Sequence, residues 1–308
     1  MKRRDVGDLL LLAALWGGSF LFMRVAAPQF GAFPLMALRT GIGALVLLPF
    51  VVHASGGAEL RANAGRIAWV GLLNSALPFV MFGYATQYLS AGYTSILNAT
   101  TPFWGAVVAY LWLGERLGRW RVLGLAIGFG GVLVLVWGRV GTGGDANGLA
   151  ILATLVATLC YGIASAATKK QLGNVSALTG AAGSQLFAAL MLLPFAIASW
   201  PAQSPDRRAW SSAVLIGVLC TGLAYLIFFR LIDRVGSTRA ISVTFLVPVF
   251  GMLWGALFLG EATTTRMFAG AATILAGTAL TTGLLDPRRW LAGARAGAAP
   301  AGKPGARS

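Results

Sequence analysis

Residues 102–115 read PFWGAVVAYLWLGE, and residues 248–261 read PVFGMLWGALFLGE. Both stretches begin with proline, continue as an apolar run and end in Leu-Gly-Glu. The two prolines lie 146 positions apart, as do Glu115 and Glu261. Self-similarity at a fixed offset indicates an internal repeat, in which one structural unit occurs twice along the chain.

The repeat extends over most of the sequence. Other matched pairs are Gly124 and Gly270, Gly131 and Gly277, and Phe79 and Tyr225 at an offset of 146, with Trp16 and Tyr161, Arg24 and Lys169, and Pro49 and Pro194 at an offset of 145. We therefore predict two similar halves, over residues 6–140 and 147–285, and a basic, disordered tail over residues 286–308.

The composition is that of a chain embedded in lipid. Of the 308 residues, 57% are hydrophobic and 11% are charged, whereas soluble domains carry about 25% charged residues. About 20 apolar residues span a bilayer as a helix. We expect ten spans, at about residues 8–27, 34–53, 67–87, 92–113, 120–138, 147–168, 176–198, 210–230, 237–259 and 267–285.

The first apolar run has a basic start, as a signal peptide does. Because the run continues past Phe22, it is long enough to span a bilayer, and we interpret it as an uncleaved first helix. Each half then contributes five spans. Since five is odd, the second half enters the membrane inverted relative to the first. The predicted fold is an all-α membrane protein with ten transmembrane helices in two inverted five-helix repeats.

The net charge of +15 is explained by membrane topology and does not point to nucleic acid. With the N-terminus in the cytoplasm, 18 of the 24 Lys and Arg residues fall in cytoplasmic segments. Only Arg139, Arg207, Arg208 and Arg266 fall in the opposite segments. Basic residues concentrate on the cytoplasmic side of membrane proteins, so we predict that both termini are cytoplasmic.

Several motifs resemble those of EamA-type transporters of the drug/metabolite transporter superfamily. They are Leu15-Trp16-Gly17-Gly18-Ser19-Phe20, Ala37-Leu38-Arg39, Pro102 followed by Leu113-Gly114-Glu115-Arg116-Leu117, and Pro248 followed by Leu259-Gly260-Glu261. The resemblance covers about residues 6–285. It implies a multi-pass carrier of the inner (plasma) membrane, often an exporter of amino acids or other metabolites. The second half departs from the pattern, because Ala262 stands where the first half has Arg116.

The ionisable residues favour a carrier over an enzyme. None of the nine acidic residues lies clearly within a span, and the single histidine, His53, lies near a span end. An intramembrane enzyme needs a nucleophile with a base, or a metal cluster. Cys160 and Cys220 fall within apolar runs and are interpreted as small buried side chains. We expect no catalytic residue, no metal site, no cofactor and no obligate protein partner; the expected partners are a small-molecule substrate and the lipid bilayer.

Polar and aromatic residues at mid-depth are candidates for a solute site, because unpaired polar groups are costly in lipid and face the protein interior. The candidates are Trp16, Ser19, Arg39, Asn74, Phe79, Asn98, Tyr161, Tyr225 and Thr244. Arg39 could bind a substrate carboxylate, or extend its charged end to the membrane surface. Such a site suits an uncharged, zwitterionic or aromatic solute.

Pro102, Pro248, Glu115 and Glu261 are candidates for hinges or gates. We expect both prolines to kink their helices from within. Each glutamate could cap the helix that follows it in the chain, or pair with a cation in a gate. Arg24 and Lys169, which are repeat mates at span ends, are expected to anchor the helices at the membrane surface.

Together these residues predict a secondary transporter of a small organic solute, such as an amino acid, working by alternating access as an exporter or facilitator. Two alternatives stay open. A channel-like pore would need a filter of carbonyls or charged rings. A proton-coupled drug exporter would need a titrating carboxylate within the membrane, for which Asp8 is the nearest candidate.

Overall fold

The computed structural model describes residues 2–137 and 144–284, which form helices and no strand. The first half comprises α1 (Arg3–Phe30), α2 (Ala32–His53), α3 (Gly57–Ala62), α4 (Ala64–Gly71), η1 (Leu72–Ala76), α5 (Leu77–Tyr88), α6 (Ala91–Asn98), α7 (Thr101–Leu113) and α8 (Arg119–Val136). The second half comprises α9 (Gly144–Gln171), α10 (Ala177–Ala198), α11 (Arg207–Gly217), η2 (Val218–Leu223), α12 (Ala224–Val235), α13 (Ser237–Ile241), η3 (Ser242–Phe245), α14 (Val247–Leu259) and α15 (Thr265–Thr281). The predicted tail, 286–308, lies outside the described residues.

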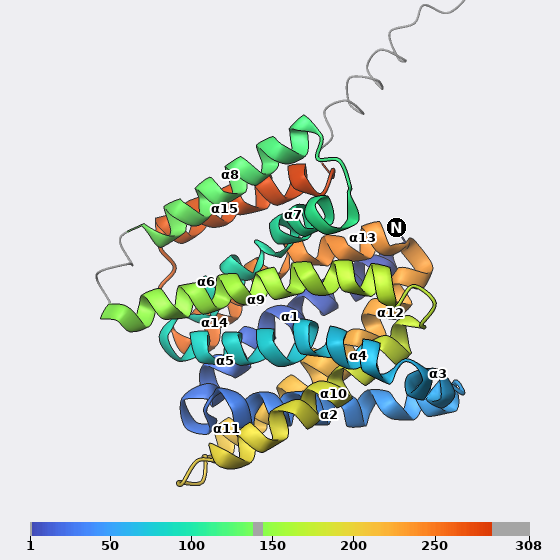
Figure 1. The fold of residues 1–308 in the computed structure, drawn as a ribbon. Coiled ribbons are helices and arrows are strands. Elements are labelled where there is room, and N and C mark those ends of the chain that lie inside the picture. The colour runs from blue at the N-terminus through green and yellow to red at the C-terminus, as the bar shows by residue number, and fades with distance from the viewer. Residues whose placement is uncertain (1, 138–143, 285–308) are drawn as a thin grey trace, which may run out of the picture.

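The two halves repeat the same order of elements. Helices α1 and α9 have 28 residues each, and α2 and α10 have 22 each. The segment α4–η1–α5 corresponds to α11–η2–α12, α6–α7 corresponds to α13–η3–α14, and α8 corresponds to α15. In Figure 1, α9 runs in the opposite direction to α1.

Nine helical segments in the described ranges are long and apolar enough to cross a membrane. The chain is therefore a multi-pass membrane protein. The tenth predicted span, 267–285, corresponds to α15, which has 17 residues, one fewer than the shortest of the nine, α8. Length and composition thus support nine of the ten predicted spans in this part of the chain.

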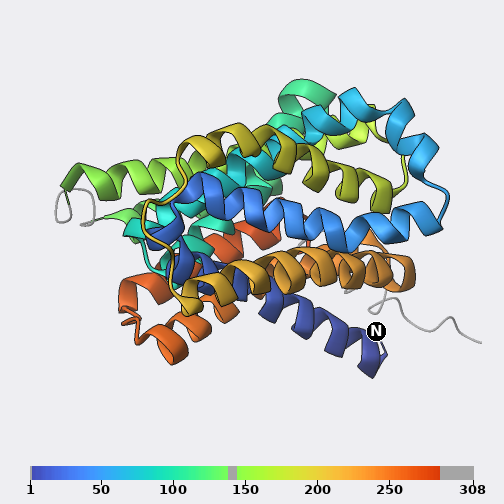
Figure 2. The same cartoon turned by 90° about the horizontal axis from the view of Figure 1, so that it is seen from below.

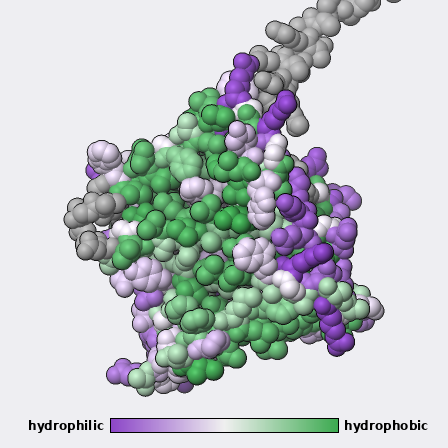
Figure 3. Space-filling view, in the orientation of Figure 1, coloured by the Kyte–Doolittle hydropathy of each residue, from purple (hydrophilic) through white to green (hydrophobic). Residues whose placement is uncertain are grey.

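The helices form a bundle with a pair at each edge. Helix α8 packs against α15 at one edge, and α2 packs against α10 at the opposite edge. The other long helices lie between these pairs in Figure 1. The view from below in Figure 2 shows the α2–α10 side of the bundle facing the viewer. In Figure 3, apolar side chains cover the middle of one face, while hydrophilic side chains gather at the end that carries the N-terminus.

Helices α8 and α15 approach closely because glycines line their contact. A Cβ atom added at Gly277 would lie 2.5 Å from the backbone nitrogen of Gly128 and 2.6 Å from the carbonyl oxygen of Gly124. Small residues permit such backbone approach between membrane helices. Gly124 of α8 therefore meets Gly277 of α15, and Gly131 meets Gly270 across the same contact.

Each half contains a π-helical segment at the same place, η1 in the first and η2 in the second. The two begin 146 positions apart, at Leu72 and Val218. In η2 the hydroxyl of Thr221 donates a hydrogen bond to the carbonyl of Ile216, five residues earlier, at 3.0 Å. Pi-bulges of this kind occur frequently at functional sites, and sequence analysis did not predict them.

Pro102 and Pro248 lie in the first turn of a helix. The prediction that they kink their helices from within is therefore wrong. The fourth span is interrupted between α6 and α7, with Pro102 in the first turn of α7. The ninth is interrupted through η3, with Pro248 in the first turn of α14. A proline in the first turn leaves no hydrogen bond unmade, because the first amides of a helix lack intrahelical partners.

Both α7 and α14 end in the same turn. Gly114 and Gly260 adopt left-handed conformations, with φ of +68° and +62°, which glycine tolerates best. The next amide folds back in each case, from Glu115 to the carbonyl of Ala109 at 3.2 Å and from Glu261 to that of Gly255 at 3.1 Å. This pattern closes a helix C-terminus, and it places the two glutamates at opposite ends of the bundle.

Candidate functional site

A buried arginine lies at the centre of the candidate residues. Arg39, on α2, is 6% exposed. Its Nε donates a hydrogen bond to Thr221 Oγ1 at 3.1 Å, and its guanidinium carbon lies 3.7 Å from the ring centroid of Phe79. One Nη group also approaches the sulfur of Met23 at 3.8 Å. Arg39 therefore points into the bundle and does not extend to the membrane surface.

Two tyrosines lie near this charge. Tyr161 on α9 and Tyr225 on α12 are both close enough to interact electrostatically with the Arg39 guanidinium. The side chain of Asn74 lies close to the hydroxyl of Tyr225. The structure thus brings five of the predicted site residues, Arg39, Asn74, Phe79, Tyr161 and Tyr225, into one group, here called the Arg39 cluster.

The Arg39 cluster contains no carboxylate. In the described ranges, the acidic side chains that form ion pairs do so with Arg24, Arg121, Lys169 and Arg234, all at the ends of the bundle. A buried cation without a counter-ion is costly in a medium of low dielectric. The cation–π contact with Phe79 and the hydroxyl of Thr221 compensate only part of that cost.

The second half contributes a buried amide that also packs against α2. Gln185 on α10, the repeat mate of Thr40, is 0% exposed, and its Nε2 donates to Ser75 Oγ at 2.8 Å. Ser75 in η1 is the equivalent of Thr221 in η2. The Oε1 atom of Gln185 is buried and has no hydrogen-bond partner. Sequence analysis did not include Gln185, Ser75 or Thr221 among the site residues, although the 146-residue offset relates Ser75 to Thr221.

The remaining solute-site candidates make no polar contact with the Arg39 cluster in the described ranges, although Trp16 packs against the apolar core that contains Phe79. Trp16 packs on Phe228 with ring centroids 5.2 Å apart, and Ser19 donates to the carbonyl of Trp16 at 2.7 Å. Thr244 donates to the carbonyl of Ile241 at 2.8 Å. Asn98 ends α6, where its carbonyl accepts from Thr101 at 2.8 Å.

Glu261 joins three elements at one end of the bundle. Its carboxylate accepts hydrogen bonds from the backbone amides of Ala91 at 2.9 Å and Gly92 at 3.3 Å, at the N-terminus of α6. Arg24 lies 3.9 Å away and also donates to the carbonyls of Thr86 and Gln87 at 2.8 and 2.7 Å. We call this set of contacts the Glu261 latch. Glu261 therefore caps α6. The sequence had predicted instead that it could cap α15, the helix that follows it in the chain.

At the other end of the bundle, Glu115 makes only some of the contacts that Glu261 makes. Its carboxylate binds Lys169 at 2.6 Å and lies 3.9 Å from Arg121. The hydrogen bond from Lys169 and its charge hold the pKa of the Glu115 carboxyl below its ordinary value. In the described ranges, Glu115 makes no hydrogen bond to the N-terminus of α13, the equivalent of α6. Its side chain is 36% exposed, against 14% for Glu261.

Lys169 and Arg24 are thus more than surface anchors. Each pairs with the glutamate of the opposite half, so the two ion pairs are repeat mates that link the halves at opposite ends. Other contacts between the halves are also present at both ends. Glu59 accepts the amide of Ser176 at 2.9 Å, and Asp206 accepts Gln29 Nε2 at 3.0 Å.

The packing of the interrupted spans differs between the ends. At Gly251 on α14, an added Cβ would lie 2.5 Å from Cβ of Ser95 on α6. At Gly105 on α7, the equivalent position, no atom lies within 4 Å. Ser95 is fully buried, whereas its equivalent, Ile241 on α13, is exposed. Helices α6 and α14 are therefore packed together, while α7 and α13 are apart.

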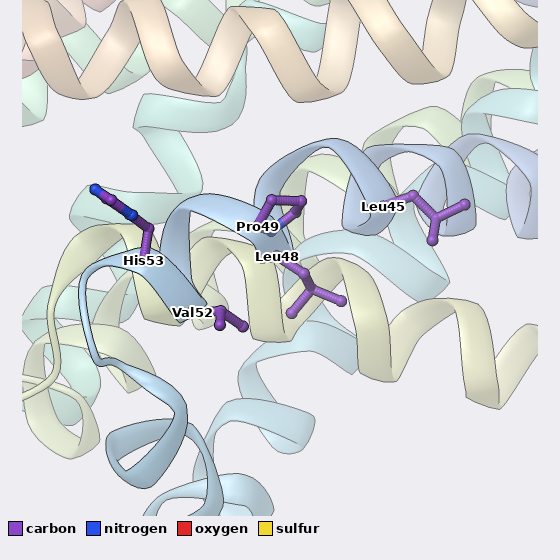
Figure 4. A pocket seen from close by; sticks show the side chains of 5 residues that line it. All are labelled: Leu45, Leu48, Pro49, Val52 and His53. Carbon is purple, nitrogen blue, oxygen red and sulfur yellow. The ribbon is translucent and has the colours of Figure 1, made fainter.

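A shallow hollow of about 530 Å³ lies away from these groups, near the end of α2. Figure 4 shows its lining side chains, which are Leu45, Leu48, Pro49, Val52 and His53. Leu45 and Val52 are among the exposed apolar residues. The hollow is thus part of the apolar outer surface and contains none of the candidate residues.

The sequence profile of the EamA-like transporter family matches residues 7–137 and 148–283, once in each half. The chain belongs to the EamA-like transporter family. The two matches coincide with the two structural halves, so each half of this EamA-family protein is one copy of the family unit.

The alignments with similar known proteins cover nearly all of this chain. A Bacillus subtilis protein named uncharacterized transporter YvbV is 26% identical over 89% of this chain and 90% of its own length. A Salmonella typhimurium protein named as a probable amino-acid metabolite efflux pump is 26% identical over 90% of this chain and 94% of its own. A solved crystal structure superimposes with a TM-score of 0.65 at 21% identity, covering 94% of this chain and 99% of that one. The last match shows the shared fold.

Proposed function

We propose that this EamA-family protein is a secondary transporter that moves a small organic solute across the inner membrane by alternating access. In this proposal α15 is the tenth span, and the halves are inverted five-helix repeats. At 1.5 Å per residue, the 17 residues of α15 extend about 26 Å, close to the hydrocarbon thickness of about 30 Å. Its packing along α8 supports the assignment, because α8 is itself a candidate span.

The observation that carries the proposal is the unequal state of two equivalent ends. The Glu261 latch is closed, with α6 packed on α14, while Glu115 lacks the helix contact and α7 is apart from α13. A protein of two similar halves can exchange these arrangements without changing the chemistry of either end. Transporters with inverted repeats alternate access in this way around a site near the bilayer midplane.

We assign the Glu115 end to the cytoplasm, together with both termini. The distribution of Lys and Arg along the sequence supports this orientation, as does the hydrophilic end visible in Figure 3. The structure then corresponds to a form whose external end is latched. Pro102 and Pro248 would act as hinge positions, because each begins the helix that follows an interruption.

We propose amino acids or related metabolites, including aromatic ones, as the solutes. The name of the Salmonella relative, a probable amino-acid metabolite efflux pump, and the aromatic side chains of the Arg39 cluster support this class. The described carboxylates lie at the ends of the bundle or in connections, so the protein is assigned as a facilitator or exporter without a proton-binding carboxylate at mid-depth.

The test is counterflow in proteoliposomes. Vesicles loaded with an unlabelled amino acid should transiently accumulate the labelled one from outside, with saturation and with equal rates in the presence and absence of a pH gradient. Protein-free vesicles are the control. Linear flux without counterflow would establish the pore alternative, and uptake driven against its gradient by pH would establish proton coupling.

A further inference from the structure

Two of the buried polar groups that lack complementary partners in the described residues approach α2. Arg39 is a cation without a carboxylate in the described structure, and Gln185 Oε1 is an acceptor without a donor. They have opposite requirements: one needs an anion, and the other needs a hydrogen-bond donor. Neither requirement is met by the protein itself.

The spacing of the two groups follows from Gly43, one turn after Arg39 on α2. A Cβ added at Gly43 would lie 2.6 Å from Cγ2 of Thr221 and 3.8 Å from Cγ of Gln185. The hydroxyl of the same Thr221 accepts the bond from Arg39. The Gln185 side chain therefore approaches α2 about one turn, or about 5.4 Å, along the helix from Arg39. The missing side chain of Gly43 makes room for the methyl group of Thr221, which fills that position.

The local folds present both groups in the same manner. Arg39 contacts a hydroxyl in the π-helical segment of the second half, and Gln185 contacts a hydroxyl in that of the first. The two hydroxyls, of Ser75 and Thr221, are repeat mates. Arg39 and Gln185 stand at neighbouring positions of the repeat, because α2 and α10 are related by an offset of 145.

From these contacts we propose that Arg39 and Gln185 are the head-group site for the carried solute. The site takes a zwitterion, whose carboxylate binds the Arg39 guanidinium and whose ammonium group donates to Gln185 Oε1. Phe79, Tyr161 and Tyr225 supply the surface for an apolar or aromatic side chain. This inference rests on the proposed transport function and assigns the solute chemistry to two named residues.

The proposal is tested by binding, which does not depend on a completed transport cycle. The full chain in lipid nanodiscs is titrated with labelled L-phenylalanine, in competition with 3-phenylpropionate, which lacks the ammonium group, and 2-phenylethylamine, which lacks the carboxylate. Wild-type protein should bind L-phenylalanine more tightly than either analogue, by about 10-fold or more, since hydrogen bonds to charged groups contribute about 1.5–3 kcal/mol each.

Two variants separate the two contacts. Arg39→Met should weaken L-phenylalanine and 3-phenylpropionate by about 10- to 100-fold and leave 2-phenylethylamine unchanged. Gln185→Leu should weaken L-phenylalanine and 2-phenylethylamine and leave 3-phenylpropionate unchanged. Arg61→Met, the same change at an exposed position, is the matched control, and melting temperatures check folding. If a variant fails to fold, the relative affinities of the wild-type protein for the three probes still test the proposal.

The proposal is overturned if wild-type protein fails to bind L-phenylalanine or binds either analogue as tightly. It is also overturned if folded Arg39→Met retains wild-type affinity for L-phenylalanine. Its failure is distinct from failure of the transport function, because counterflow of other amino acids by the wild-type protein would persist in the first case and be absent in the second.

Discussion

The Glu261 carboxylate holds together segments that are far apart in the sequence. It receives two amide hydrogen bonds from the N-terminus of α6, where the helix dipole favours an anion, and it lies beside Arg24 on α1. Glu115 has the same sequence context but a different set of partners. The different partners of these two glutamates therefore show which end of the molecule is latched.

Removing the charge of Glu261 should release the latched end. Glu261→Gln keeps one acceptor but loses the charge, which we expect to shift the equilibrium by about 1–3 kcal/mol towards the form open at that end. Ser95, fully buried on α6, reports the opening as Ser95→Cys in a background without Cys160 and Cys220. A membrane-impermeant maleimide should label it faster in the Glu261→Gln variant.

Glu115→Gln in the same Ser95→Cys background is the matched control. Since the carboxylate of Glu115 does not hold α6, this change should leave the labelling rate at or below that of the parent. Equal labelling of the Glu261→Gln and Glu115→Gln proteins would contradict the assignment of Glu261 as the latch.

At the scale of elements, the contact of α8 with α15 depends on backbone approach. Gly277→Ala should lower the melting temperature in detergent, because the new methyl group would overlap backbone atoms of α8, and overpacking of this kind costs about 1–3 kcal/mol. Gly130→Ala on α8 is the matched control, since no atom lies within 4 Å of the added Cβ. A Gly277→Ala protein as stable as Gly130→Ala would show that the helices do not pack this closely.

The interruptions before α7 and α14 are the second feature at this scale. Pro248→Ala restores an amide in a first turn where none is required, so we expect the melting temperature to change by only a few degrees. The counterflow rate should fall several-fold, because a helix that can continue through residues 246–247 resists bending there. An unchanged rate would argue against a hinge role, and Pro49→Ala, outside the interrupted spans, serves as the control.

At the scale of the whole molecule, we expect engineered cysteine pairs at the two ends to form disulfides with different yields. Cysteines at Gly92 and Met252, on the packed helices α6 and α14, should oxidise to a disulfide readily, because Cβ at position 92 would lie 3.1 Å from Cα of Met252. Cysteines at Gly105 and Ile241, on α7 and α13, should not do so in the same form. Either disulfide should abolish counterflow, and a reductant should restore it.

Glu261→Gln should reverse the yields of the two cross-links if both ends belong to one equilibrium. Independent yields would mean that the ends open separately, which is inconsistent with strict alternating access.

The sequence alone was sufficient for the features that depend on local pattern. Long apolar runs predict helices in lipid, because a membrane helix satisfies its own backbone hydrogen bonds. The 145- and 146-residue offsets predict the two halves, and the family follows from motifs within them. Mid-depth placement also selected Arg39, Asn74, Phe79, Tyr161 and Tyr225, which the structure brings together, since polar and aromatic groups at that depth turn inward; their role in binding stays a prediction.

Only the tertiary structure decided which residues act together over long distances. Nothing near Glu261 indicates that its partner is the first turn of α6, 170 positions earlier in the chain, nor that Glu115 would lack the equivalent contact. The unpartnered oxygen of Gln185 and the absence of a counter-ion for Arg39 emerge only when every neighbour is in place. Hydropathy and helix formation depend on residues close in the sequence, whereas hydrogen-bond partners and the state of each end depend on how whole helices pack.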